Sequence, residues 1–146
     1  MSIKIEIGSA ADIVALSKQI PEFEQATTLE LLHSRLDGAE SLILVAKLEG
    51  TLVGYKVGYQ LTEDTFYSWL GGVIPEHRKH GIATLLLNYQ EKWVRNSGYK
   101  QIKVKSMNRF PGMLNLLISN GYEIVGVDES VCGSEGKIVF LKRLAV

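Results

Sequence analysis

The sequence contains little cysteine, histidine or proline, and neither sign of charge is in excess. Its single cysteine, Cys132, cannot form an internal disulfide, and metal sites built on several cysteines are excluded. The histidines, His33, His77 and His80, do not have the H-E-x-x-H spacing of a zinc site. Because 16 Lys and Arg residues balance 16 Asp and Glu residues, no global charge draws the chain to nucleic acid or to a membrane. Any electrostatic function must therefore be local.

Long apolar runs are also missing. No stretch approaches the length of a membrane span, and the N-terminal sequence MSIKIEIGS alternates apolar and polar residues, unlike the apolar region of a signal peptide. The 146 residues are 46% hydrophobic and 22% charged, which is ordinary for a globular domain with a hydrophobic core. No repeat or linker divides the chain. We therefore expect residues 1–146 to form one cytoplasmic domain without a metal ion.

The spacing of apolar residues predicts alternating strands and helices. Ser9 with Asp12, and Thr27 with Glu30, have the spacing of capping boxes at two helix starts. The paired glycines at 71–72 indicate a bulge within a strand, or a ligand close to the backbone. Strands are predicted over residues 3–7, 42–48, 52–61, 65–74, 101–107, 124–127 and 138–144, and helices over 10–20, 28–37, 82–97 and 113–120. This order predicts a mixed α/β sheet with helices on its faces.

Residues 78–84, RKHGIAT, place charge at the start of a predicted helix. A helix N-terminus has unpaired backbone amides and a partial positive charge. Gly81 would let a ligand approach the backbone, and Arg78 and Lys79 add cationic side chains. The segment lacks the second glycine and the lysine of a P-loop, and the glycines of a dinucleotide fingerprint. Two interpretations are left: a pyrophosphate site, or a solvated charged turn.

The same segment and its surroundings resemble the GNAT superfamily of acyl-CoA-dependent N-acetyltransferases. The family signature [QR]-x-x-G-x-[GA] matches residues 78–83, RKHGIA, and its preceding V-x-P matches residues 73–75. A later strand, short helix and G-[FY] match IKVKSMN, MLNLLISN and Gly121-Tyr122, so the resemblance covers nearly the whole chain. It implies the GNAT fold: a central mixed, mostly antiparallel sheet of about seven strands, with helices on both faces.

The resemblance further implies that acetyl-CoA is the co-substrate. Its diphosphate would lie on the amides of residues 79–84, and its pantetheine arm would pair with the fourth strand where that strand parts from the fifth. An amide near a bulge at residues 71–72 would hold the developing oxyanion. The residues implied in acetyl-CoA binding are Gly72, Val73, Ile74, Arg78, Lys79, His80, Gly81, Ile82, Ala83, Thr84 and Asn108.

The acid, the base and the acceptor pocket are less well defined. Many family members carry a tyrosine general acid at the position of Leu117, so the acid is unassigned here, and Tyr122 is expected to be a core aromatic. Glu24 lies in the loop that lines the acceptor pocket in this family; it is a candidate to bind or deprotonate the amine, or else a solvated carboxylate. Tyr67 and Trp69 would wall the acceptor pocket, or pack in the core.

Two functions stay open from the sequence. The first is an N-acetyltransferase that transfers the acetyl group of acetyl-CoA to a primary amine of a small molecule or protein, by direct attack on the thioester. The alternative is a non-catalytic acyl-CoA-binding regulatory module, which the leucine at position 117 favours slightly. The acceptor is not identified, because acceptor loops are the variable part of such sites. Neither function involves nucleic acid or membrane, and a homodimer is an open option.

Overall fold

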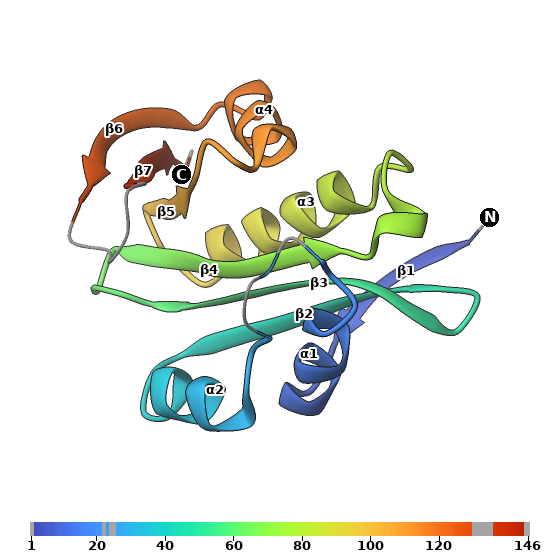
Figure 1. The fold of residues 1–146 in the computed structure, drawn as a ribbon. Helices are drawn as coiled ribbons and strands as arrows, with labels where there is room; N and C mark the ends of the chain where they lie inside the picture. Colours follow the sequence, from blue (N-terminus) through green and yellow to red (C-terminus); the bar gives the residue numbers. More distant parts are fainter. Residues whose placement is uncertain (1, 22, 24–25, 130–135, 145–146) are drawn as a thin grey trace.

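The structure is a computed structural model that describes residues 2–21, 23, 26–129 and 136–144. A seven-stranded mixed sheet runs through it, with α1 and α2 on one face and α3 and α4 on the other (Figure 1). The elements are β1 (Ile3–Ile7), α1 (Ala10–Ser17), α2 (Leu29–Leu36), β2 (Ser41–Leu48), β3 (Thr51–Gln60), β4 (Thr65–Val73), the 3-10 turn η1 (Pro75–His77), α3 (Ile82–Asn96), β5 (Gln101–Ser106), α4 (Pro111–Ser119), β6 (Glu123–Asp128) and β7 (Lys137–Arg143). The predicted order of strands and helices is confirmed; η1 was not predicted.

The strands lie in the order β1-β2-β3-β4-β5-β7-β6. Every neighbouring pair is antiparallel except β4 and β5, which are parallel and are connected through α3. Parallel neighbours need such a crossover, because a short turn can only reverse the chain. The predicted mixed, mostly antiparallel sheet is confirmed. No helix among the described residues combines the length and apolarity needed to cross a membrane.

The hydrophobic core fills the space between the sheet and the helices on both faces. α1 contributes Ile13 and Leu16, and α3 contributes Leu86, Leu87 and Val94, all buried. Ile13 and Leu16 are three residues apart, and Leu86 and Leu87 lie eight and seven residues before Val94, about two helical turns, so each set is on one side of its helix. Burying one such side chain contributes about 1.5–3 kcal/mol, so this packing fixes both helices on the sheet.

The two predicted helix starts have different outcomes. Ser9 caps α1 as predicted, since its hydroxyl accepts from the Asp12 amide at 3.2 Å and the Asp12 carboxylate accepts from the Ser9 amide at 3.0 Å. The prediction of Thr27 as the second cap is wrong by one residue. Thr28 caps α2 and accepts from the Leu31 amide at 3.1 Å, while the buried Thr27 donates its amide to Ser17 Oγ at 3.0 Å. Thr27 therefore ties this loop to α1.

The bulge in β4 lies at Trp69 rather than at the paired glycines. Ser68 is opposite Gly58 and Leu70 is opposite Val57, so Trp69 is the additional residue. The glycine at 72 has a steric reason instead: a Cβ there would lie 2.5 Å from Ile20 Cδ1. The irregularity was predicted in the right strand but two residues too late.

The sheet opens between β4 and β5. The two strands pair only from Thr65 with Gln101 to Ser68 with Val104. Beyond Ser68, β4 stays paired with β3 as far as Val73, while β5 pairs with β7. The backbone of β4 from the bulge to Val73 therefore has β3 on one side and an opened edge on the other.

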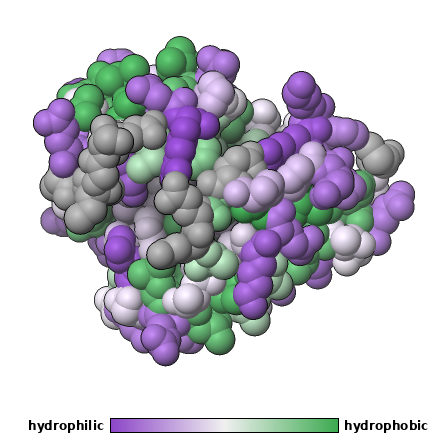
Figure 2. All heavy atoms as spheres, viewed as in Figure 1, coloured by the Kyte–Doolittle hydropathy of each residue, from purple (hydrophilic) through white to green (hydrophobic). Residues whose placement is uncertain are grey.

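β6 is an edge strand of this sheet and is largely exposed. Ile124, Val125 and Val127 are more than half exposed, as is Ile118 on α4, and Figure 2 shows hydrophobic side chains over these two elements. A second bulge lies here, because Ile124 is opposite Phe140 and Gly126 is opposite Val139, which leaves Val125 as the additional residue. The edge is therefore apolar but irregular.

Candidate functional site

The opened edge of β4 leads directly into the N-terminus of α3. Gly81 precedes α3 with φ of 80°, in the left-handed region, where residues with a Cβ are strained. The Leu85 amide donates to the Gly81 carbonyl at 3.0 Å, so the amides of residues 82–84 precede the first hydrogen bond of the helix. A Cβ at Gly81 would have no neighbour within 4 Å. The turn therefore presents backbone donors to an open surface.

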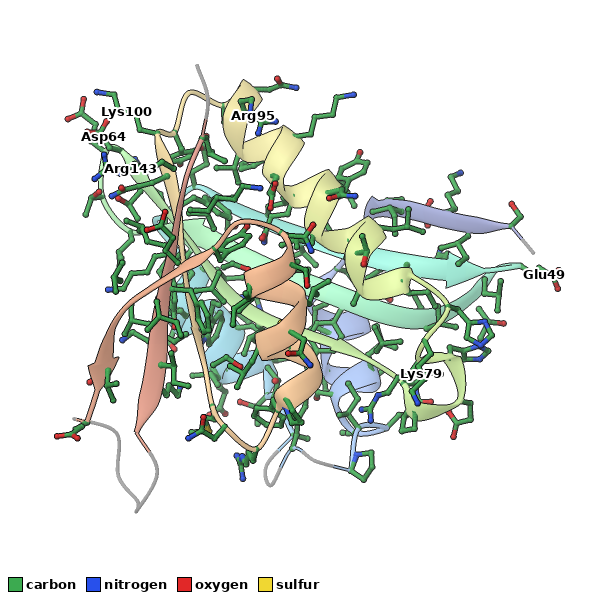
Figure 3. The ribbon with its side chains drawn as sticks, turned by 90° about the horizontal axis from the view of Figure 1, so that it is seen from above. Glu49, Asp64, Lys79, Arg95, Lys100 and Arg143 are labelled. Atoms are coloured by element: carbon green, nitrogen blue, oxygen red, sulfur yellow. The ribbon has the colours of Figure 1, made fainter. Side chains whose placement is uncertain are left out.

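The cationic residues before Gly81 differ in their placement. Arg78 is half-buried, and its Nε donates to the Val73 carbonyl at 3.1 Å, so this side chain holds the loop against the end of β4. Lys79 and His80 are exposed, and Figure 3 shows Lys79 on the loop between η1 and α3. Lys79 also has a left-handed φ of 66°, which is uncommon for a non-glycine residue.

The backbone groups of β4 alternate between β3 and the opened edge. The Ile74 amide donates to the Val53 carbonyl at 3.0 Å, so the prediction that this amide is free is wrong. Because backbone groups of alternate residues in a strand point the same way, Gly72 also faces β3. Gly71 and Val73 therefore present their backbone groups to the opened edge. Of the three predicted residues, Val73 alone faces this edge, where its carbonyl already accepts from Arg78 Nε, and Gly71 faces the same way.

The remaining predicted residues are distributed around this region. Ile82 is buried, so it can offer only its backbone, while Ala83 and Thr84 are half-buried. Asn108 is exposed in the turn between β5 and α4. Glu24 lies outside the described residues.

The position without the family tyrosine is part of the core. Leu117 is fully buried in α4. Tyr122 is also buried, as predicted, and its hydroxyl donates to Glu91 Oε2 at 2.8 Å. Burial, reinforced by the Glu91 carboxylate, raises the pKa of Tyr122 above its ordinary value. A phenol held in this way is a poor proton donor to a ligand.

A buried charged cluster lies between α3 and the sheet, and the sequence interpretation missed it. Glu91 of α3 accepts from Tyr122 and also from Lys142 Nζ of β7 at 2.8 Å. Lys56 of β3 is buried nearby, and burial lowers its pKa to about 8 against the opposing attraction of Glu91. A Cβ at Gly71 would lie 3.6 Å from Lys56 Nζ. The ammonium is therefore beside the opened edge of β4.

The other face of the sheet has a cavity of about 250 Å³ at the same level of β4. Tyr67 and Trp69 line it, and both make edge-to-face contacts with Tyr59, at centroid distances of 5.5 and 5.8 Å. Burial is the main cause that raises the pKa of Tyr67 to about 12. The lining residues are Arg35, Tyr59, Leu61, Tyr67, Trp69, Lys103, Lys105 and Lys137. We name this cavity the cationic pocket.

Comparison with known proteins identifies the arrangement. The model of the acetyltransferase (GNAT) family matches residues 11–117. The chain belongs to the GNAT acetyltransferase family. This GNAT chain is therefore an acyltransferase whose co-substrate is acetyl-CoA, while its acceptor is not specified by the family. Comparison by sequence with curated proteins gives no match.

Solved GNAT structures have the same fold. Ard1 from Thermoplasma volcanium is similar with a TM-score of 0.86 at 14% identity, covering 100% of both chains. The ribosomal-protein-S18-alanine N-acetyltransferase from Escherichia coli has a TM-score of 0.84 at 13% identity, over 99% of this chain and 96% of that one. A GNAT acetyltransferase from Elizabethkingia anophelis with acetyl-CoA bound has a TM-score of 0.76 at 19% identity, over 97% and 98%. At such identities the likeness concerns the fold.

Proposed function

We propose that this protein transfers the acetyl group of acetyl-CoA to a primary amine by direct attack on the thioester. The observation that carries the proposal is the continuous path from the bulge at Trp69, along the opened edge of β4, to the amides at the start of α3. A diphosphate would lie on the amides of residues 79–84, where unpaired donors and the helix dipole favour negative charge. The pantetheine arm would pair with Gly71 and Val73.

The thioester then lies near the bulge, within reach of both faces of the sheet. The neutral amine nitrogen attacks the thioester carbonyl carbon, and a backbone amide of the opened edge near the bulge stabilises the oxyanion. Collapse of this intermediate breaks the C–S bond, the nitrogen loses its proton, and the thiolate takes one up. The protein contributes by orienting the two reactants and by stabilising the charge that develops, and these two effects account for a large part of enzymatic rate enhancements.

The acceptor would enter from the cationic pocket, because Trp69 belongs both to that pocket and to the bulge. Glu24 is our candidate for a group that binds or deprotonates the incoming amine. The proton for the thiolate is not assigned to a side chain, since Leu117 has none to give and the Tyr122 hydroxyl is held by Glu91.

The cofactor part of the proposal is tested with Gly81→Asp. The new carboxylate would repel the diphosphate and occupy its place, so we expect acetyl-CoA binding to weaken about 10- to 100-fold, which corresponds to about 1.4–2.7 kcal/mol. The measurement is the rise in melting temperature with acetyl-CoA, since a ligand of the native state stabilises it. Gly98→Asp is the matched control, because Gly98 also has a positive φ, of 94°, but lies beyond the other end of α3. If acetyl-CoA raised the melting temperature of both variants by the same amount, the diphosphate would have to bind elsewhere.

One observation favours the second candidate, a regulatory module that binds acyl-CoA without turnover: Leu117 has no proton to donate to the thiolate. The two functions separate in an assay that follows free thiol from acetyl-CoA with a panel of amines. Transfer predicts thiol release that depends on the amine. A module predicts undiminished acetyl-CoA binding with no amine-dependent thiol release.

A further inference from the structure

The cationic pocket contains more positive charge than its own residues balance. Among the residues that the structure describes, its cations come from α2 (Arg35), β5 (Lys103 and Lys105) and β7 (Lys137), and none of the lining residues is a carboxylate. Lys105 is paired with Asp128 at 2.7 Å. Within the described part of the chain, no carboxylate lies at salt-bridge distance from Lys103 or Lys137. An excess of like charge around one cavity is unfavourable unless an anion enters it.

Arg35 is oriented by the aromatic residues of the pocket. Its guanidinium lies 4.7 Å from the ring centre of Trp69, and its Nη1 donates to the Tyr59 hydroxyl at 3.2 Å. Stacking and a hydrogen bond together fix the plane of the guanidinium. A planar guanidinium held in this way is suited to bind a carboxylate or a phosphate. The same aromatic rings provide apolar walls for the rest of a ligand.

From this pocket we infer that the acetyl acceptor is a small molecule with an anionic group, a carboxylate or phosphate, beside the amine that is acetylated. The inference rests on the proposed transfer function and names its substrate class. Arg35, Lys103 and Lys137 hold the anion, and the aromatic walls surround the body of the molecule. A cavity of about 250 Å³ is slightly below the usual range for drug-sized ligands, so it accommodates an amino acid or a short amino phosphate.

The first test compares matched amines as acceptors, with free thiol from acetyl-CoA as the readout. The pairs are phenethylamine with phenylalanine, and ethanolamine with phosphoethanolamine, which separate carboxylate from phosphate. We expect the anionic member of one pair to have a kcat/KM at least about 10-fold higher, with a KM that rises with salt. Equal rates within both pairs overturn the inference. Acetylation of acidic peptides alone overturns the assignment to a small molecule.

The second test uses Arg35→Met and Lys103→Met, which keep an unbranched apolar stem and remove the charge. Each should raise KM for the anionic acceptor about 10-fold or more, while KM for the neutral acceptor and for acetyl-CoA stays within about 2-fold. Lys92→Met is the matched control, since Lys92 is exposed on α3, on the other face of the sheet. An unchanged preference for the anionic acceptor in both pocket variants overturns the inference.

Binding distinguishes a failure of this inference from a failure of the transfer function. Phenylalanine, phosphoethanolamine and inorganic phosphate are titrated into the protein while tryptophan fluorescence and melting temperature are followed. If no amine yields free thiol, but an anion still changes the tryptophan emission and Lys103→Met abolishes that change, transfer is wrong and the anion site stands. No anion-dependent signal in the unaltered protein, together with no anion preference in turnover, overturns the site.

Discussion

Lys56→Met should stabilise the protein at neutral pH, and the gain should disappear in alkali. Lys56 is buried on β3, and its pKa falls from an ordinary 10.5 to about 8. At about 1.36 kcal/mol for each pH unit, this difference corresponds to a cost of about 3 kcal/mol for holding the ammonium in the native state. Methionine has a similar length, fills the same space and carries no charge.

The sign of the pH dependence follows from proton binding. Between about pH 8 and 10.5 the unfolded chain keeps the lysine proton and the native state loses it, so the free energy of unfolding rises with pH over this window. Below pH 8 the full cost is present. The difference between Lys56→Met and the unaltered protein should therefore be largest at pH 7 and fall by up to about 3 kcal/mol towards pH 10.5. Buried tyrosines titrate in both proteins and cancel in this difference.

Urea unfolding at pH 7, 8, 9 and 10, followed by tryptophan fluorescence, measures this difference. Lys92→Met serves as the control, because it makes the same substitution at an exposed position of α3. A difference that is the same at all four pH values would refute the reasoning. It would show that the Lys56 amine has the same protonation in the native and unfolded states, and hence that water or Glu91 compensates for its burial.

Two further predictions concern the acid and the base. Tyr122→Phe should keep most of the transferase activity. It should lower the free energy of unfolding by about 1–3 kcal/mol, because it leaves Glu91 without one hydrogen-bond donor. Removal of a general acid would instead lower kcat about 10²–10⁴-fold, so a loss of that size at unchanged acetyl-CoA affinity would make Tyr122 the acid. Glu24→Gln should lower kcat or raise the acceptor KM if that carboxylate meets the amine. Kinetics with an acceptor found in the amine panel measure both effects on activity, and unaltered constants in Glu24→Gln would make Glu24 a solvated loop residue.

The fold could be predicted from the sequence because most of its signals are local. Alternating isoleucines mark β1, and Gly81 and Gly98 bracket α3, so element order follows from short-range pattern. The errors come from tertiary contacts. Thr27 matches a cap, but its burial against Ser17 moves the cap to Thr28. The bulge at Trp69 depends on pairing with β3, which no local pattern specifies.

In the candidate site, too, features formed by one contiguous segment could be predicted, while contacts between distant residues could not. The start of α3 was predictable, since one contiguous segment forms it. The cationic pocket was only half predictable: Tyr67 and Trp69 stand on one strand, but Arg35 and Lys137 come from distant parts of the chain. Lys56 did leave a signal, a charged residue within the otherwise buried strand β3. Its meaning depends on the neighbouring Glu91 and Gly71, which lie far from it in the sequence.

The bulge at Val125 bears on how the molecule avoids its own copies. β6 ends the sheet with an apolar strand, and such an edge can pair with the edge of another chain and start aggregation. A bulge bends the strand and interrupts the regular row of backbone groups that an incoming strand would need. Acidic residues, Glu123 and Asp128, close the strand at both ends. We therefore expect the irregular edge to disfavour strand-to-strand association in concentrated solution, and a variant with a regular β6 to lose this protection.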